Sequence, residues 1–449
     1  MRSDARFSED SRQSVHIAMG GFALLLPLIP WWQSIVLAAF TVLFNLFGLQ
    51  RLLGRRLFRP GERIGRFTSG IVLYPLTVLL LLLVFGGRLD IVAAAWGIFA
   101  AGDGMATIVG RRAPIARIPW NRQKSLGGTL AFALCGAAAG IGLAWWCRDT
   151  VMPPAYTWFF FVAPVLAAFV AAAVETIPIS LDDNVSVPAS AAGVMWVVSL
   201  VSIDLIDAFV RAGASRLFTA AGANVVVALA GYAAATVTLA GMIAGAVLGT
   251  AIFLFTGPAG WALLLLCFAV AVVTSRMGLA RKRALGIAEE RGGRRGAGNA
   301  IANTGVAAIA ATMSALTYAE ADARLAFVAA LVAGASDTVA SEIGKAWGQR
   351  TFLVTTARRV PPGTSGAMSL EGTAAGVVSA ALLGGAACGL GIIAWEMLLY
   401  VVAAATAGAL VESALGATLE HRGVLNNDVL NFINTGVAVF VAVELWQLR

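Results

Sequence analysis

The sequence predicts an all-α polytopic membrane protein, with about 15 transmembrane helices in two fused domains related by a parallel repeat. Three observations predict this class. Of the 449 residues, 59% are hydrophobic and only 12% are charged, whereas about 25% of a soluble domain is charged. Apolar runs of membrane-spanning length follow one another along the chain. Short polar motifs also recur in the same order in both halves.

The apolar runs define the expected spans, since about 20 residues cross a bilayer as a helix. We expect spans to begin near residues 15, 33, 68, 90, 127, 157, 189, 223, 241, 260, 299, 325, 370, 391 and 429. With the N-terminus in the cytoplasm, alternation of these spans places four basic clusters on the cytoplasmic side, as the positive-inside rule requires. The clusters are 51–66, 111–124, 276–295 and 345–359.

Several function classes are disfavoured by composition. The net charge is +8, but the basic residues lie in short loops between apolar runs, so we expect no nucleic-acid partner. Two histidines and four scattered cysteines without a CxxC pair predict neither a zinc site nor a disulfide framework. The metalloprotease, phosphate-loop and nucleophile-elbow motifs are also absent from the sequence.

A polar segment from Asp204 to Asn224 interrupts the apolar pattern near the middle of the chain. It predicts a first membrane domain at 1–205, a linker at 206–222 and a second membrane domain at 223–449. Arg211 and Arg216 would then lie on the side that the charge rule disfavours. An interfacial helix at this position would hold both arginines at the membrane surface.

The two halves share an ordered set of motifs. Asp103 and Asp337 each lie near the expected cytoplasmic end of a span, and each is followed by a basic loop and then by Ser-Leu-x-Gly-Thr, at 125–129 and 369–373. One span later each half has Val-Glu, ending at Glu175 and Glu412, and then a polar turn. The number of intervening spans keeps both copies facing one side, so the repeat is parallel rather than inverted.

The repeated residues suit phosphoryl transfer to a membrane lipid. Carboxylates hold Mg²⁺, which also binds substrate phosphates. Arginine, lysine and helix N-termini neutralise phosphate oxygens. Phosphoryl transfer needs this positioning and charge neutralisation more than covalent chemistry. Because the motifs lie at the membrane interface, we expect a lipid acceptor whose tail lies between spans and a cytosolic nucleoside triphosphate as donor.

The same reasoning assigns a role to each candidate residue. Glycines beside Asp103 would let the backbone approach the nucleotide closely. The expected metal ligands are Asp103, Glu175, Asp182 and Asp183 in the first half and Asp337, Glu342, Glu412 and Asp428 in the second, and all of these except Asp182 join Lys124 as catalytic candidates. The nucleotide-binding candidates are Arg111, Arg112, Ser125, Gly127, Gly128, Thr129, Lys345, Gly363, Thr364, Ser365, Gly366, Ser369 and Thr373. The substrate-binding candidates are Arg12, His16, Arg295, Asn299, Asn303, Asn427 and Asn431.

Structural roles remain open for several of these residues. Asp103 could instead cap a helix end or pair with a neighbouring arginine. Lys124 could be a topology-determining charge alone. Glu175 and Glu412 lie at span ends, where exposure to water costs little, and His16 could lie at the interface without chemistry.

The first half resembles the phytol kinase and dolichol kinase family of integral membrane kinases over residues 8–205. The resemblance is carried by RQSVH at 12–16, GDGMATIVGRR at 102–112, KSLGGT at 124–129 and VETIPISLDDNVSVP at 174–188. It implies transfer of a phosphoryl group, commonly from CTP, to the hydroxyl of an isoprenoid alcohol.

The second half is similar to the membrane family to which plant phytyl-phosphate kinase belongs, over residues 222–449. The matching segments are 292–305, 336–344, 363–373, 411–420 and 426–436. This similarity implies phosphorylation of an isoprenyl monophosphate to the diphosphate. Together the two halves predict a bifunctional isoprenoid salvage enzyme, in which Asp103 and Asp337 do equivalent work in separate sites.

Two other functions remain open from the sequence. Both families distantly resemble CDP-diacylglycerol synthase, so a CTP-dependent cytidylyltransferase that releases pyrophosphate is the first alternative. A lipid or small-molecule transporter built on a parallel repeat is the second. A transporter would place its polar residues near the middle of the membrane, whereas here the matched polar residues gather at one face.

Overall fold

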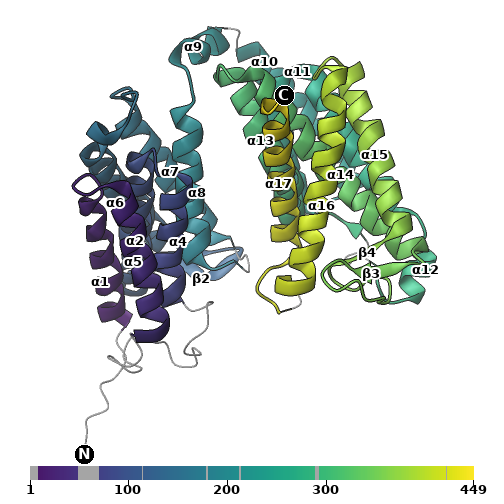
Figure 1. The fold of residues 1–449 in the computed structure, drawn as a ribbon. Helices are drawn as coiled ribbons and strands as arrows, with labels where there is room; N and C mark the ends of the chain where they lie inside the picture. The colour runs from purple at the N-terminus through teal and green to yellow at the C-terminus, as the bar shows by residue number, and fades with distance from the viewer. Residues whose placement is uncertain are drawn as a thin grey trace, which may run out of the picture. The chain divides into compact units, whose positions relative to one another are not determined.

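The computed structural model describes residues 9–48, 70–113, 115–177, 181–211, 214–288, 293–420 and 422–449. The chain divides into two compact units, unit 1 from Met1 to Leu200 and unit 2 from Val201 to Arg449 (Figure 1). The segment expected as a linker, 206–222, is helical in its described parts and belongs to unit 2.

The described residues of unit 1 form helices around a central one, together with a two-stranded hairpin. Its elements are α1 (Glu9–Gly20), η1 (Gly21–Leu25), α2 (Trp31–Leu43), η2 (Phe44–Gly48), α4 (Gly70–Val84), α5 (Leu89–Arg112), β1 (Arg117–Ile118), β2 (Asn121–Ser125), α6 (Leu126–Trp146), η3 (Arg148–Thr150), α7 (Phe159–Thr176) and α8 (Asp183–Ser199).

Unit 2 has the same general construction. Its elements are α9 (Ile203–Arg211), α10 (Ala214–Ala233), α11 (Leu239–Arg276), α12 (Leu279–Ala284), α13 (Ala297–Leu316), α14 (Glu320–Trp347), β3 (Thr351–Leu353), β4 (Ala367–Ser369), α15 (Leu370–Gly389), η5 (Trp395–Met397), α16 (Leu398–Leu415), η6 (Gly416–Glu420) and α17 (Asn427–Gln447).

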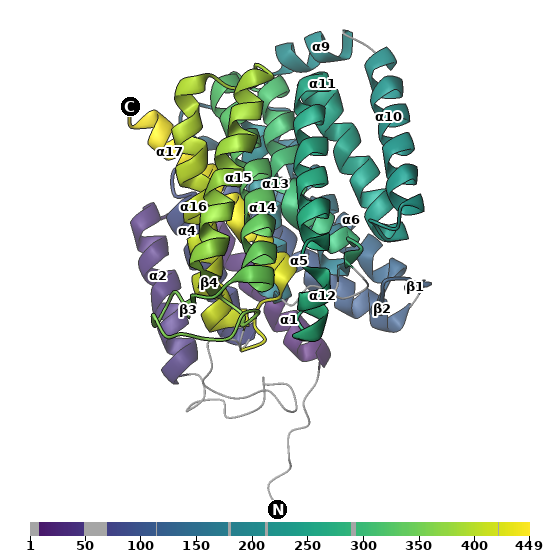
Figure 2. The same cartoon turned by 90° about the vertical axis from the view of Figure 1, so that its right-hand side faces the viewer.

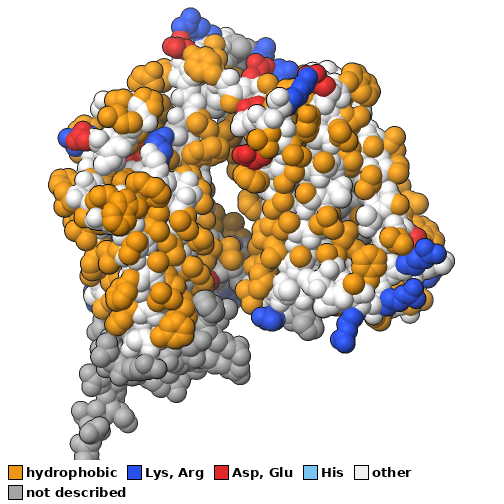
Figure 3. Space-filling view, viewed as in Figure 1, with side chains coloured by type: hydrophobic (Ala, Val, Ile, Leu, Met, Phe, Trp, Pro, Cys, Tyr) orange, Lys and Arg blue, Asp and Glu red, His pale blue; other side chains and the backbone are white. Residues whose placement is uncertain are grey.

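The described residues contain eleven helices long and apolar enough to cross a membrane, and α8 with α9 form a twelfth candidate. The all-α membrane class is therefore confirmed, whereas the count of about 15 stays a prediction. Part of the difference is short helices: α4 has 15 residues and α8 has 17. Hydrophobic side chains cover the helices of both units, and Lys and Arg gather at the end of unit 2 that carries β3 and β4 (Figure 3).

Helix α11 accounts for another part of the difference. Its 38 residues would rise about 57 Å if straight, far more than a bilayer needs. It bends at Gly257, where φ is 70° and ψ is −166°. Gly249 and Trp261 both contact Asn224, although they would be about 18 Å apart on a straight helix. The expected spans near 241 and 260 are thus the two arms of α11, which fold back on each other.

Each unit is organised around one buried helix, α5 in unit 1 and α14 in unit 2. Every residue of Leu89–Ala100 and of Leu325–Ser336 is buried. Both stretches are rich in alanine, and small side chains let neighbouring membrane helices approach closely. The central helices thereby hold their C-terminal ends, which carry Asp103 and Asp337, among the surrounding helices.

The sequence repeat corresponds to a repeated structural element. α5 is followed by the antiparallel β1–β2 hairpin and α6, and α14 by the antiparallel β3–β4 hairpin and α15. Ser125 and Ser369 are the N-caps of α6 and α15. Ser125 Oγ accepts the Gly128 N–H at 3.2 Å, and Ser369 Oγ accepts the Gly372 N–H at 3.0 Å. The serine of each motif is therefore required to begin a helix.

Glycine contacts align the two copies residue by residue. Gly110 of α5 lies against Ser125 and Gly128, and Gly344 of α14 lies against Ser369 and Gly372. Counting back seven residues from each of these glycines gives Asp103 and Asp337. The two aspartates therefore occupy corresponding places in their units.

The helix expected at the interface is α9, but it carries only Arg211, because Arg216 lies in α10. It is amphipathic, and its exposed side chains include Ile203 and Val210. Arg211 pairs with Asp207 one turn earlier on the same helix. The pairing lowers the cost of the arginine at the membrane surface.

Candidate active sites

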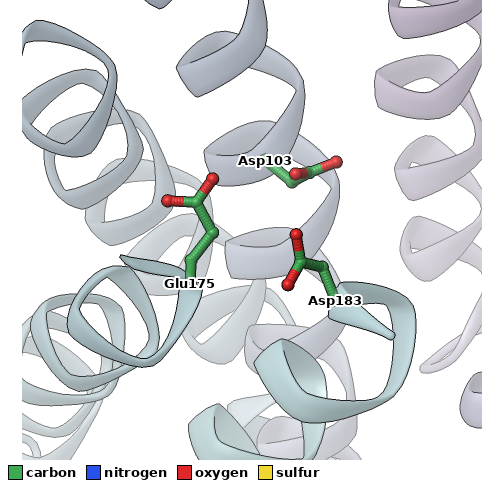
Figure 4. A group of neighbouring side chains, drawn as sticks. All are labelled: Asp103, Glu175 and Asp183. Carbon is green, nitrogen blue, oxygen red and sulfur yellow. The ribbon is translucent and has the colours of Figure 1, made fainter. Parts of the chain in front are cut away.

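Three carboxylates from three helices meet in unit 1. Asp103 comes from α5, Glu175 from the end of α7 and Asp183 from the first turn of α8 (Figure 4). One oxygen from each lies within 4.8 Å of the others. Among the described residues this is the one group of His, Cys, Asp and Glu side chains with metal-binding spacing.

Lys124, from β2, joins two of these carboxylates. Its Nζ lies 2.5 Å from Glu175 Oε1 and 3.1 Å from Asp183 Oδ2. Burial lowers the pKa of Lys124, but the charges of Glu175 and Asp183 outweigh it and raise the pKa above its ordinary value. The lysine is therefore a permanent cation within the carboxylate group.

The unit 1 carboxylates fit a magnesium ion. Oxygen ligands from carboxylates are what Mg²⁺ prefers. Glu175 is only 3% exposed, and its Oε2 has no hydrogen-bond partner among the described residues. An unpartnered buried carboxylate oxygen is costly, and a cation beside it would remove that cost.

Asp182, also expected as a metal ligand, is placed differently. It is the N-cap of α8, and its Oδ1 accepts the Asn184 N–H at 2.9 Å and the Asn184 side-chain amide at 2.5 Å. Its neighbour Asp183 points into the carboxylate group instead. Of these two adjacent acids, Asp182 therefore caps α8 and Asp183 belongs to the carboxylate group.

His16 of α1 lies beside the carboxylate group. Its Nε2 is 3.5 Å from Asp103 Oδ2, and its ring packs edge-on against Tyr74 and Phe99 at centroid distances of 4.8 Å. Trp96 Nε1 donates to the Tyr74 hydroxyl at 2.8 Å. His16 is therefore brought to Asp103 as the sequence predicted, while Tyr74 and Trp96 were not expected there.

An apolar cavity of about 190 Å³ adjoins this aromatic group. It lies among α1, η1, α2, α4 and α5, and Met19, Tyr74 and Trp96 are part of its lining. The unit 1 site therefore has a polar side at the carboxylates and an apolar side within the helix bundle.

The glycines around Asp103 serve helix packing. A Cβ at Gly102 would lie 2.8 Å from the Phe132 ring of α6, and one at Gly104 would clash with Ile17 of α1. This explains the glycines by contacts with α6 and α1. The expectation that they open the backbone to a nucleotide stays a prediction beside this packing role.

The remaining unit 1 candidates lie where α5 meets α6. Arg111 and Arg112 are exposed in the last turn of α5. Gly127 and Gly128 lie against the carbonyl oxygens of Ala113 and Ala106, at 2.8 and 2.9 Å from the position of a Cβ. In the same turn, Thr129 Oγ1 donates to the Ser125 carbonyl at 3.2 Å.

Unit 2 has a polar cavity of about 320 Å³ at the end of α14. Most of the residues expected from the sequence line it together. Thr338, Ser341, Ser413 and Glu420 also line it and were not expected. The expected residues in the lining are Arg295, Asn299, Asp337, Glu342, Lys345, Gly363, Thr364, Ser365, Gly366, Ser369, Thr373, Glu412, Asn427 and Asn431.

Glu342 is bound by two lysines. Lys282 Nζ lies 2.5 Å from its Oε2, and Lys345 Nζ lies 2.9 Å from its Oε1. Lys282 and Glu342 have side chains only 1% and 2% exposed. Lys282 belongs to the basic cluster 276–295, and the sequence predicted for this lysine a role in topology alone. No sequence signal pairs it with Glu342, which lies 60 residues later.

Two further acids of unit 2 take different positions. Glu412 lines the cavity with Asp337, and its Oε2 is buried without a hydrogen-bond partner among the described residues. Asp428 instead lies against Gly298 in the first turn of α13, where the helix dipole favours a negative charge. Asp428 is therefore corrected from a cavity ligand to a neighbour of a helix end, while Asn427 and Asn431 line the cavity.

The 363–366 loop contacts η6, the segment that follows α16. Gly363 and Gly366 have positive φ angles of 85° and 70°. Ser365 Oγ donates to the Glu420 carboxylate and to the Gly416 carbonyl. A Cβ at Gly366 would clash with the backbone of Ala417, so only glycine allows this close approach.

The substrate candidates at the start of α13 are linked by hydrogen bonds. Arg295 Nη1 donates to Asn299 Oδ1 at 3.1 Å, and the Asn303 side-chain amide donates to the Asn299 carbonyl at 2.9 Å. Arg295 and Asn299 line the polar cavity, whereas Asn303 lies beyond it. α13 packs on α14 as α1 packs on α5.

The chain matches known protein sequences in two ways. The family model of integral membrane protein DUF92 matches residues 222–439. Protein VTE6, chloroplastic, of Arabidopsis thaliana is 37% identical over 214 residues, which are 46% of this chain and 64% of that protein. Probable phytol kinase 3, chloroplastic, of Glycine max is 34% identical over 191 residues, 40% of this chain and 59% of that protein.

The match to a third relative covers a larger share of that relative's length. An uncharacterized membrane protein of Synechocystis sp. is 39% identical over 203 residues, which are 44% of this chain and 79% of that protein. This chain spans less than two thirds of the length of VTE6 and of the phytol kinase. No solved structure matches it. With these matches, the chain belongs to the integral membrane protein family DUF92.

Proposed function

We propose that this chain is a bifunctional membrane lipid kinase. Unit 1 transfers a phosphoryl group from a nucleoside triphosphate, with CTP as the first candidate, to an isoprenoid alcohol. Unit 2 phosphorylates the isoprenyl monophosphate to the diphosphate. The observation that carries the proposal is that each unit combines carboxylates and at least one lysine near the end of its central helix with an apolar cavity beside them.

The unit 1 group supports transfer to a hydroxyl. The isoprenol oxygen bonds to the γ-phosphorus, the bond to the β,γ-bridging oxygen breaks, and a nucleoside diphosphate and the hydroxyl proton leave. Lys124, with Arg111 or Arg112, would neutralise phosphate charge. Asp103, Glu175 and Asp183 would hold Mg²⁺, which supplies charge neutralisation of the nucleotide phosphates when bound.

The unit 2 cavity supports an anionic acceptor. A phosphate acceptor needs cations and N–H donors around it, and Arg295, Asn299 and Lys345 line the cavity. Asn299 follows Arg295 by four residues, as His16 follows Arg12 in unit 1. Unit 2 therefore has an asparagine where unit 1 has a histidine, and we relate this difference to the proposed acceptors, a phosphate in unit 2 and an alcohol in unit 1.

Lys345 and the acids of unit 2 take separate roles in this proposal. Asp337 and Glu412 would hold Mg²⁺, because both line the cavity and Glu412 Oε2 lacks a partner among the described residues. Glu342 would position Lys345 for the phosphates. Both sites would open toward the cytosol, where the nucleotide is.

The relatives support the same chemistry. The Glycine max relative is named a probable phytol kinase, and the second half resembles the family of plant phytyl-phosphate kinase. The pairing of both resemblances in one chain is what supports two consecutive phosphorylations.

The test uses the purified full chain in lipid nanodiscs. It is incubated with isoprenols or isoprenyl monophosphates, Mg²⁺ and each nucleoside triphosphate, and products are followed by mass spectrometry. We expect monophosphate and diphosphate together with nucleoside diphosphate. Release of pyrophosphate with a CDP-lipid would establish the cytidylyltransferase instead. Absence of phosphorylated product with every donor would exclude the kinase.

A further inference from the structure

Unit 2 contains an apolar cavity of about 140 Å³ besides its polar cavity. It is lined by residues of α10, both arms of α11, α13 and α14 (Figure 2) and is partly open, since Gly245 in its lining is exposed. Its lining is mostly apolar and includes Leu248, Leu264 and Phe268. An engineered apolar cavity of about 150 Å³ binds benzene, so this cavity has room for a small hydrocarbon group.

The apolar and polar cavities meet at three residues. Arg295, Asn299 and Thr338 line both. The Arg295 guanidinium donates to Asn299 Oδ1 at 3.1 Å and to Ser275 Oγ at 3.4 Å, and its backbone N–H donates to the Thr236 carbonyl at 2.9 Å. The arginine is therefore held at the junction between a polar space and an apolar one.

Gly241 and Gly245, in the first arm of α11, line the apolar cavity beside the junction. Gly241 packs against the Arg295 backbone. Gly245 lies one turn farther, about 6 Å along the helix, and a Cβ there would meet no atom within 4 Å although the residue lines the cavity. At the same cavity, Trp261 Nε1 donates to Asn224 Oδ1 at 3.0 Å, so the buried amide oxygen is satisfied within the protein.

We propose that this apolar cavity binds the isoprenoid chain of the monophosphate, with the phosphate in the polar cavity beside Arg295. The proposal rests on the proposed function of unit 2. The first isoprene unit passes Gly241, and the second lies beside Gly245. A phosphate with a hydrocarbon tail matches a cation between a polar and an apolar cavity. A water-soluble phosphate would leave the apolar cavity without a ligand group.

The test fills the cavity beside the second isoprene unit. Gly245→Phe introduces a ring into open space, so the fold is retained. Gly222→Phe is the matched control, since Gly222 of neighbouring α10 is also exposed with no atom within 4 Å of its Cβ, but does not line the cavity. Monophosphates with one, two and four isoprene units are compared as substrates at a fixed nucleotide concentration.

We expect Gly245→Phe to lower kcat/KM for the two- and four-unit monophosphates by about tenfold or more, because burial of two methylene groups already accounts for that factor. The one-unit monophosphate keeps its wild-type kcat/KM, and Gly222→Phe behaves as wild type throughout. Equal effects on all three lengths, or the same length dependence in Gly222→Phe, would overturn the proposal.

A binding measurement separates this inference from the proposed function. If the wild-type chain phosphorylates no monophosphate, the kinase activity of unit 2 is excluded. Native mass spectrometry with the two-unit monophosphate then tests whether the apolar cavity binds the isoprenoid tail, independently of catalysis. Lower occupancy in Gly245→Phe than in wild type and Gly222→Phe supports the tail site, and equal occupancy in all three chains overturns it.

Discussion

At the scale of single residues, lysines organise the carboxylates of both sites. Lys124 joins Glu175 and Asp183 in unit 1, and Lys282 with Lys345 holds Glu342 in unit 2. Burying an ionised carboxylate without a partner costs several kcal/mol, and these lysines supply that partner. Under the proposed function, Asp103 and Asp337, which occupy corresponding positions, would each mark the place of phosphoryl transfer in their unit.

Asp103→Asn and Asp337→Asn keep side-chain shape and remove one charge each. We expect Asp103→Asn to lower isoprenol phosphorylation by about a hundredfold or more, since even outer-shell changes at metal sites cost 10–100-fold. Conversion of added monophosphate stays unchanged. Asp337→Asn does the reverse, so monophosphate accumulates. Product analysis by mass spectrometry checks both. Loss of both steps from either substitution, in a folded chain, would indicate one composite site, and no change in either step would make the aspartates structural.

Lys282→Met and Lys345→Met compare how much the buried and the partly exposed partner of Glu342 contribute to the stability of unit 2. Lys282 is 1% exposed and Lys345 is 26% exposed, although both bind Glu342. Removing one partner of a buried ion pair costs about 3–5 kcal/mol, so Lys282→Met lowers the unfolding temperature more than Lys345→Met. Thermal unfolding of the purified chain in detergent measures this. An equal or smaller shift for Lys282→Met would contradict the assignment of Lys282 as the buried anchor.

At the scale of elements, the repeated contact between a central helix and the next helix positions the sites. The serine N-caps and the glycines that follow them bring α6 onto α5 and α15 onto α14. The carbonyls of Ala106 and Ala340 occupy the places where side chains at Gly128 and Gly372 would lie. The close approach therefore depends on the absence of a Cβ.

Gly372→Ala tests this contact, with Gly385→Ala as the control on the same helix. A Cβ at Gly372 would clash with the Ala340 carbonyl, whereas one at Gly385 meets only Trp395, at 3.9 Å. Overpacking costs about 1–3 kcal/mol, while Gly→Ala in a helix interior otherwise gains up to about 1 kcal/mol. We expect lower thermal stability for Gly372→Ala and unchanged or higher stability for Gly385→Ala. The opposite order would mean that α15 does not need the close contact.

At the scale of the whole molecule, each unit carries a complete set of parts. Each has its own buried central helix, hairpin, polar site and adjoining apolar cavity. Two sites in one chain would let a product of unit 1 become the substrate of unit 2 without leaving the membrane. Nothing in this arrangement requires both sites to belong to one chain.

Mixing the two aspartate variants in the same vesicles tests that independence. Asp337→Asn chains make monophosphate, and Asp103→Asn chains convert it, because the lipid product diffuses in the shared bilayer. We expect the mixture to form diphosphate from isoprenol, although neither variant does so alone. If only wild-type chains form diphosphate, the intermediate passes between units of one chain.

The sequence by itself determined the membrane class, the repeat and most members of the candidate sites. Hydropathy is a local property, so apolar runs predict spans directly, and the Ser-Leu-x-Gly-Thr motif marks two helix starts because N-capping is local too. The ordered motifs also paired Asp103 with Asp337. The same local signals could not separate Asp182, which caps α8, from Asp183, which joins the site.

Only the tertiary structure decided which charged groups meet. Lys124 reaches Glu175 across 51 residues and Lys282 reaches Glu342 across 60, while Asp428 is directed to Gly298 of α13. The reversal of α11 at Gly257 and the junction at Arg295 likewise depend on how distant helices pack. Side-chain partners follow from helix rotation and packing of whole elements, and a linear pattern of residue types does not contain that information.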